Sequence, residues 1–179
     1  LRYNRNIRNM FEDITVNKSD LIQPIFLVEG KNIKEEISSM PDYYRYSLDN
    51  IGREVKYLWE LGVQAVLLFA KIPENLKDNT GAEALNIDGL MQRGIKEIRN
   101  TVPEITIMTD VALDPYSNYG HDGIVENNEI LNDKTNEILS KMALSHAMAG
   151  ADVIAPSDMM DGRVLSIRNI LEKNGFHNT

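Results

Sequence analysis

The sequence predicts an α/β protein built on a parallel sheet, and three observations carry this prediction. Four apolar stretches, at residues 21–28, 63–70, 105–112 and 152–157, are rich in the branched side chains typical of buried strands. Each is followed by a segment whose apolar residues recur at helical spacing. No hairpin signal is evident between these units. Strands and helices that alternate in this way form a parallel sheet wound in one hand.

The four predicted helices are bounded by residues suited to capping. Ser, Asn and Asp side chains accept hydrogen bonds at helix N-termini, and glycine adopts the left-handed conformation that ends many helices. The first helix is predicted between Ser47 and Gly62, and the second carries an apolar stripe over residues 87–98. The third is predicted to have its N-cap at Asn132 or Asp133 and to end at Gly150. The fourth has an apolar stripe of Val164, Ile167, Ile170 and Leu171 and is ended by Asn174 and Gly175.

Residues 1–19 are predicted to form a polar N-terminal arm, and residues 20–179 hold the four βα units. A (βα)8 TIM barrel takes roughly 250 residues, so this length corresponds to about half of one. The alternative is an open doubly wound sheet. No Gly-x-Gly-x-x-Gly follows the first strand, which disfavours dinucleotide binding. In both folds the site lies at the C-terminal ends of the strands.

Composition excludes several classes of protein. The 179 residues include no cysteine, so disulfides and thiolate metal sites are excluded. A formal charge of −8 argues against nucleic acid as the main partner. No apolar run approaches the roughly 20 residues that span a bilayer, and no signal peptide is visible. We therefore expect a cytoplasmic protein with no membrane partner.

Candidate site residues follow the third and fourth strands. Asp110 comes from the third strand, and the loop after it supplies Asp114, His121 and Asp122. Ser157 ends the fourth strand, and the polar residues that follow it are Asp158, Asp161 and Arg163. Because parallel strands end at one edge of the sheet, Asp110 and Ser157 are expected to converge.

Each of these residues also has a purely structural interpretation. Asp110 could cap its loop, and Ser157 could be the N-cap of the fourth helix. An Asp–Arg pair that fixes the start of that helix would explain Asp158, Asp161 and Arg163. His121 could be a ligand or an acid/base group, or it could only orient the loop.

Four motifs of the chain are distinctive, namely Thr109-Asp-Val-Ala-Leu-Asp-Pro-Tyr116, Gly120-His-Asp-Gly-Ile124, Ala149-Gly-Ala-Asp152 and Ala155-Pro-Ser-Asp-Met-Met-Asp-Gly-Arg-Val164. They closely resemble the porphobilinogen synthase family, also called 5-aminolevulinate dehydratase. The resemblance runs along almost the whole chain. It implies a (βα)8 barrel whose N-terminal arm embraces a neighbouring subunit, in a homo-oligomer expected to be an octamer.

The resemblance also implies a reaction, the condensation of two 5-aminolevulinate molecules to porphobilinogen with loss of two waters. The substrate ketones are held as Schiff bases on two lysines that follow the fifth and sixth strands, which are expected beyond Thr179. Asp110 and Ser157 match family residues that line the pocket near the substrate amino group. Lys71, at the end of the second strand, is given no catalytic role and is expected to be solvated.

Zinc-dependent members of this family carry three cysteines where this chain has Ala112, Asp114 and Asp122. An alanine and two carboxylates do not reproduce a thiolate site, and hard oxygen ligands favour magnesium or calcium. The chain therefore resembles the branch that lacks this zinc and often responds to magnesium. The magnesium is expected to be bound mainly by residues of the second half, so its ligands are unknown.

Two other functions remain open. These residues could act only as a structural or assembly module, since the Schiff-base lysines are expected elsewhere. Without the resemblance, a magnesium-assisted lyase that uses Asp110, Asp114 and His121 is the alternative. A half barrel would leave its first and fourth strands as open edges and expose the inward faces of its strands.

Overall fold

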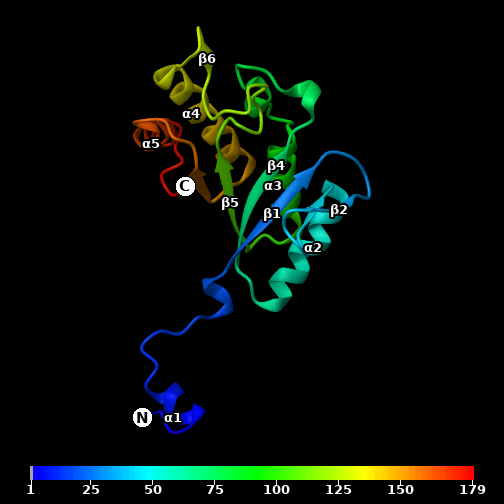
Figure 1. The fold of residues 1–179 in the computed structure, drawn as a ribbon, viewed down its shortest axis with the longest axis vertical. Coiled ribbons are helices and arrows are strands. Elements are labelled where there is room, and N and C mark those ends of the chain that lie inside the picture. The colour runs from blue at the N-terminus through cyan, green and yellow to red at the C-terminus, as the bar shows by residue number, and fades with distance from the viewer. Residues whose placement is uncertain (1) are drawn as a thin grey trace.

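The computed structural model describes residues 2–179, which form a sheet covered by helices on one face and preceded by an extended N-terminal segment (Figure 1). The strands are β1 (Ile22–Val28), β2 (Lys34–Glu36), β3 (Tyr44–Tyr46), β4 (Ala65–Lys71), β5 (Thr106–Val111), β6 (Val125–Glu126), β7 (Glu129–Ile130) and β8 (Val153–Pro156). The α-helices are α1 (Arg5–Met10), α2 (Leu48–Leu61), α3 (Leu90–Thr101), α4 (Asn132–Ala149) and α5 (Arg163–Lys173). Short 3-10 helices are η1 (Lys18–Asp20), η2 (Glu74–Leu76) and η3 (Ala82–Leu85).

The parallel core of the sheet agrees with the α/β prediction. Strands β1, β4, β5 and β8 are neighbours in that order and pair in parallel. Helices α2, α3, α4 and α5 follow them, as the alternating pattern predicts. Gly62 and Gly150 end α2 and α4 in the left-handed conformation, with φ of 96° and 113°.

The prediction of no hairpins is wrong. Strands β2 and β3 form an antiparallel pair, and β3 then pairs in parallel with β1. The first parallel strand is therefore not an edge of the sheet, whereas β8 pairs on one side only among residues 2–179. Strands of three residues are too short to show a periodic pattern. A second hairpin, β6–β7, turns at Asn127 and Asn128, whose φ angles of 51° and 63° fit a two-residue turn.

Three helix assignments also differ from the prediction. Leu131, not Asn132 or Asp133, is the N-cap of α4. The Asn132 side chain is drawn away because it bonds to the backbone of Asp161. Ile87 precedes α3 and is 66% exposed, and Val164 is 62% exposed on the outer side of α5. Helical spacing alone therefore did not identify which apolar residues of these two segments are buried.

The two faces of the sheet differ in burial. On the face packed against α2, α3 and α4, Leu27, Leu68 and Ile107 are 0% exposed. On the opposite face, Phe26 and Phe69 are only partly buried and stack with ring centroids 5.3 Å apart. We call this second surface the open face. The buried face and the open face both arise from the alternation of side chains, since successive residues of a strand point to opposite sides of the sheet.

The N-terminal segment extends away from the sheet (Figure 1). Helix α1 buries none of its residues. Five apolar side chains of this segment are more than half exposed, namely Tyr3, Met10, Phe11, Ile14 and Val16. The division into an arm at residues 1–19 and a half barrel at residues 20–179 stays a prediction.

Candidate active site

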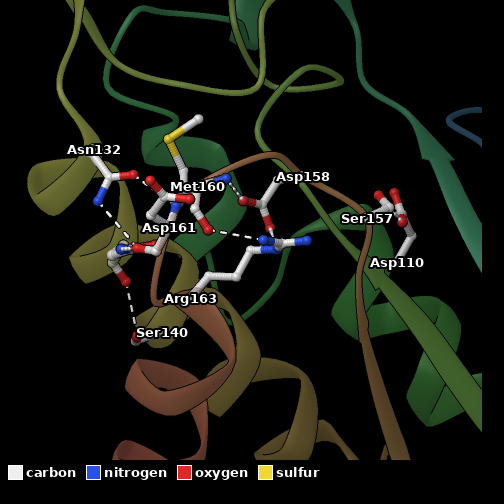
Figure 2. Close-up of polar contacts among 9 residues, drawn as sticks. Asp110, Asn132, Ser140, Ser157, Asp158, Met160, Asp161 and Arg163 are labelled. Atoms are coloured by element: carbon white, nitrogen blue, oxygen red, sulfur yellow. Dashed lines mark hydrogen bonds and ion pairs between the residues drawn. The ribbon is translucent and has the colours of Figure 1, made fainter.

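Two polar side chains meet where β5 and β8 end (Figure 2). Asp110 is the next-to-last residue of β5, and Ser157 directly follows β8. Asp110 lies opposite Ala155, which places Ser157 at the same edge of the sheet. The Ser157 hydroxyl donates a hydrogen bond of 2.5 Å to Oδ1 of Asp110. The predicted convergence of these two side chains is confirmed.

The surroundings of Asp110 disfavour its negative charge. Burial is the largest influence on the pKa of Asp110 and raises it. The hydrogen bond from Ser157 acts in the opposite direction. The nearby carboxylates of Asp114, Asp122 and Asp158 raise the pKa again by repulsion. A cationic group bound beside Asp110 would relieve this repulsion.

Asp114 shares this environment. It lies at the surface, but the surrounding protein removes enough water to raise its pKa, and the charge of Asp122 adds to the effect. The cation of Lys77 opposes both influences. The end of β5 therefore carries several carboxylates near one another, with a single lysine that offsets them in part.

Asp158 and Arg163 form an ion pair at the start of α5 (Figure 2). The Asp158 side chain is 0% exposed, and its Oδ2 lies 3.2 Å from Nε of Arg163 without hydrogen-bond alignment. Oδ1 of Asp158 accepts a bond of 2.7 Å from the Met160 amide, and Arg163 donates to the Met160 carbonyl at 2.9 Å. Burial raises the pKa of Asp158, and Arg163 opposes this. The pair fixes the turn that follows Ser157.

Asp161 takes part through its backbone. Asn132 accepts a bond of 2.8 Å from the Asp161 amide, and its own amide group donates to the Asp161 carbonyl at 3.1 Å. Asn136 donates a second bond to that carbonyl at 2.6 Å. These contacts tie the turn after β8 to the start of α4, while the Asp161 residue is exposed. The structural interpretation of Asp161 is therefore the better supported one.

His121 and Asp122 lie in the loop between β5 and β6 and are half-buried. Nδ1 of His121 accepts a hydrogen bond of 3.2 Å from the amide of Gly123, so this ring nitrogen orders the loop. Gly120 has a φ of 61°, which suits glycine. The loop brings Asp122 close enough to Asp110 and Asp114 to affect their pKa values.

Sequence reasoning missed Asn79, which holds this loop in place. Its amide donates to the Val125 carbonyl at 2.8 Å, and its carbonyl oxygen accepts from the Val125 amide at 3.0 Å. Beside it, the backbone of Asp78 bonds with Tyr116 and Asn118 at 3.1 and 3.4 Å. The loop after β4 thereby supports the loop after β5. No local pattern around Asn79 signals a contact with a residue 46 positions later.

Two buried polar side chains lie close behind the site. Tyr116 is 2% exposed, its hydroxyl has no hydrogen-bond partner among residues 2–179, and burial followed by the charge of Asp110 raises its pKa. His146 is 0% exposed. Nδ1 of His146 lies 3.0 Å from the hydroxyl of Thr109, the residue before Asp110. This hydrogen bond ties α4 to β5.

The donor set near Ala112 does not suit zinc. Ala112 is buried and supplies no ligand atom, and Asp114 and Asp122 are oxygen donors. Within residues 2–179, no group of three or more His, Asp or Glu side chains is arranged to hold a metal ion.

Lys71 is not simply solvated. It ends β4 and is 52% exposed, and its ammonium lies 3.2 Å from Oε1 of Glu35 on β2. Arg45 on β3 contacts the same carboxylate oxygen at 2.7 Å. The hydrogen bond from Lys71 is the largest of the influences that lower the pKa of Glu35.

Comparison with known proteins identifies close relatives. A family model described as delta-aminolevulinic acid dehydratase matches residues 1–179. The delta-aminolevulinic acid dehydratase of Ruminiclostridium josui is 46% identical over 176 residues, which cover 98% of this chain and 85% of that protein. The corresponding protein of Methanothermus sociabilis is 49% identical over 176 residues, which cover 98% of this chain and 54% of that protein.

A solved structure has the same fold. The crystal structure of delta-aminolevulinic acid dehydratase (porphobilinogen synthase) from Toxoplasma gondii, in complex with the reaction product porphobilinogen, superposes with a TM-score of 0.96 at 40% identity. The match covers 99% of this chain and 51% of that one. The chain thus spans about half the length of this structure and of the Methanothermus sociabilis protein.

None of the helices within residues 2–179 has the length and apolar character needed to cross a membrane.

Proposed function

Because the chain belongs to the delta-aminolevulinic acid dehydratase family, we propose that it forms the N-terminal half of an enzyme that condenses two 5-aminolevulinate molecules to porphobilinogen. Two waters are lost in this reaction. The observation that carries the proposal for this chain is the 2.5 Å hydrogen bond between Ser157 and Asp110. It brings together, at the C-terminal ends of two parallel strands, the two residues that the family resemblance assigns to the substrate pocket.

The chemistry of this pair suits an amino group. A carboxylate accepts hydrogen bonds from an ammonium group, and a hydroxyl both accepts and donates. Burial and neighbouring acids raise the pKa of Asp110, so a bound ammonium group would lower it again and favour the charged carboxylate. A proton on the substrate amine then has a nearby acceptor in Asp110, and Ser157 holds that carboxylate in place. The pair therefore binds the amine and moves its proton.

The other candidate residues are assigned supporting roles. The Asp158–Arg163 ion pair and the backbone contacts of Asp161 fix the turn that presents Ser157. Asp114 and Asp122 add negative potential beside Asp110, and His121 orders their loop. The alternative lyase that uses Asp110, Asp114 and His121 is not favoured, because the family match over residues 1–179 and the 46% identical relative support the dehydratase.

The test uses a chimaera that joins this chain to the C-terminal half of the Methanothermus sociabilis relative, assayed for porphobilinogen. Asp110→Asn and Ser157→Ala are expected to lower kcat, with the loss at Asp110 about 100-fold or more, the usual contribution of a positioned acid or base. Glu137→Gln, an exposed change on α4, is the matched control. An unchanged kcat in Asp110→Asn would remove the proposed role.

The same proposal makes the isolated 179-residue chain inactive. The family resemblance places the Schiff-base lysines after two strands that residues 2–179 do not form. We therefore expect no porphobilinogen from this chain and no borohydride trapping with 5-aminolevulinate. Trapping on Lys71 would show that this lysine had been wrongly set aside.

Magnesium is the proposed activator of the complete enzyme, and zinc is excluded from the proposal because Ala112 replaces a ligand.

A homo-octamer in which the N-terminal segment contacts a neighbouring subunit remains part of the proposal. Its support is the set of exposed apolar side chains at residues 3–16, together with the family resemblance. Sedimentation of the chimaera with and without residues 1–19 tests this assembly.

A further inference from the structure

The loop after β4 holds the loop after β5 at two points, which lie on either side of Asp122 in the chain. The first point involves the backbone alone. The Asp78 amide donates to the carbonyl of Tyr116 at 3.1 Å, and the Asn118 amide donates to the carbonyl of Asp78 at 3.4 Å. These two bonds do not depend on any side chain, so most substitutions would leave them in place.

The second point, after Asp122, depends on one side chain. Asn79 is half-buried, donates to the Val125 carbonyl at 2.8 Å and accepts from the Val125 amide at 3.0 Å. The two bonds use both the donor and the acceptor of the Asn79 amide group. An aspartate would lack the donor, and an alanine would lack both groups. This hold is therefore specific to asparagine.

The segment between the two points has no other hydrogen-bonded support. In the part of the chain that the structure describes, residues 119–123 form hydrogen bonds only among themselves and with Ser117. Gly123 packs closely against the turn after β8, since a Cβ atom at Gly123 would lie 3.3 Å from Cε of Met160. The position of Asp122 is therefore set by whatever holds the two ends of its segment.

The far end of this segment is held from two directions. The Ile124 amide donates to the hydroxyl of Thr135 at 3.0 Å, which ties the segment to α4. Asn79 ties the adjacent Val125 to the loop after β4. Without the Asn79 side chain, no hydrogen bond among residues 2–179 would join this end to that loop. The segment could then shift toward α4 and carry Asp122 with it.

Asp122 belongs to a group of carboxylates at the end of β5. Its charge adds to those of Asp110 and Asp114, and the repulsion raises the pKa of both residues. The cations of the neighbouring elements are each paired with another carboxylate: Lys77 with Glu74, Lys71 with Glu35 and Arg163 with Asp158. The group is therefore negative overall and attracts a cation.

We propose that Asn79 is a positioning residue, which through Val125 holds Asp122 where its charge helps Asp110 to bind the cationic amine of the substrate. This inference rests on the proposed function, because the proposed substrate carries that amine. Asn79 acts only through the loop after β5. The second βα unit thereby contributes to a site whose two central residues come from the third and fourth units.

The first test titrates the 179-residue chain with aminoacetone, an amino ketone without a carboxylate, and follows the amide signals of Asp110 and Ser157 by NMR. Aminoacetone is expected to shift these signals in a salt-sensitive manner, and its neutral analogue hydroxyacetone should not. Asp122→Asn should weaken aminoacetone binding about fivefold, the effect of one partly exposed charge pair. Asn79→Ala should weaken it about two- to fivefold, and it should have no further effect in the Asp122→Asn background.

Two further variants complete this test. Asn50→Ala is the matched control, because Asn50 also bonds to a distant backbone carbonyl, that of Ile33 at 3.2 Å, but lies on α2. Asn79→Gln keeps both amide groups on a longer side chain, so it is expected to fold and to lose less binding than Asn79→Ala. Equal binding to wild type and both Asn79 variants, or a loss from Asn79→Ala that persists in full beside Asp122→Asn, would overturn the proposal.

The second test uses the chimaera and separates positioning from a loss of folded enzyme. Asn79→Ala should raise the KM for 5-aminolevulinate about two- to fivefold with little change in kcat, whereas a smaller folded fraction would lower kcat at constant KM. An inactive chimaera, together with the coupled loss of aminoacetone binding, would refute the proposed function alone. An active chimaera whose KM is unaffected by Asn79→Ala would refute the positioning role alone.

Discussion

The buried histidine behind the site makes the stability of this chain depend on pH. His146 is 0% exposed on α4, and burial lowers its pKa from 6.5 to about 3. The folded chain therefore holds this ring neutral at pH values where the unfolded chain binds a proton. Because the folded-state pKa is lowered, the contribution of neutral His146 to the free energy of unfolding is fully present above pH 6.5 and is lost as the pH falls toward 3.

The size of the effect follows from the two pKa values. Stability falls by about 1.4 kcal/mol for each pH unit over which only the unfolded chain takes up the proton. Lowering the pH from 7 to 5 crosses about 1.5 such units below the unfolded pKa. The contribution of His146 to the free energy of unfolding should thus fall by about 2 kcal/mol in this interval.

The variant His146→Gln separates this proton from all others. Glutamine has no proton to gain and retains an amide that can bond with Thr109, whose hydroxyl lies 3.0 Å from Nδ1 of His146. We expect a loss of about 1–2 kcal/mol at pH 7, because the buried hydrogen bond is imperfectly replaced. At pH 5 the wild type loses its advantage, so the two proteins should be about equally stable.

Urea unfolding of the 179-residue chain, followed by the fluorescence of its single tryptophan, measures both free energies at the two pH values. His177→Gln, which removes a histidine with a side chain 65% exposed, is the control. A stability gap between wild type and His146→Gln that stays constant from pH 7 to pH 5 would refute the reasoning.

Three further predictions concern the site. Arg163→Met should lower the free energy of unfolding by about 2–4 kcal/mol, because it leaves the carboxylate of Asp158 buried without a countercharge; Arg163→Lys should recover part of this loss in the same urea assay. Asn79→Ala should cost about 1–2 kcal/mol through the two lost bonds to Val125, and faster amide hydrogen exchange at Val125 would report the freed loop. Asp110→Asn should make the chain more stable at pH 7, since the folded state disfavours this charge, and the gain should shrink as the pH is lowered toward 4; a gain that grew with acidity would contradict the raised pKa.

The sequence predicted the parallel core because its signals are local. Strand β5 alternates side chains along its length, and Gly62 and Gly150 have the left-handed conformation that ends a helix. The β2–β3 hairpin could not be predicted, because its strands are three residues long and their register depends on pairing with β1. Asn127 and Asn128 were a readable turn signal for β6–β7 that was missed.

Within the site, the two strand ends were predictable and the supports were not. Asp110 and Ser157 end parallel strands, and the topology alone brings such residues to one edge. Asn79 contacts Val125 across 46 positions, and Asn132 holds Asp161 across 29. Contacts of this kind depend on how loops of neighbouring units meet, which no periodicity within either loop encodes.

The raised pKa of Asp110 is itself an argument for a ligand. Asparagine at this position would accept the bond from Ser157 without a charge to desolvate, so stability alone favours the amide. The negative charges of Asp114 and Asp122 increase the cost of the Asp110 charge, because they raise the pKa of Asp110 by repulsion. A carboxylate retained against this cost is explained by a cation that binds it, since only the bound state offsets the repulsion. The proposed substrate amine is such a cation.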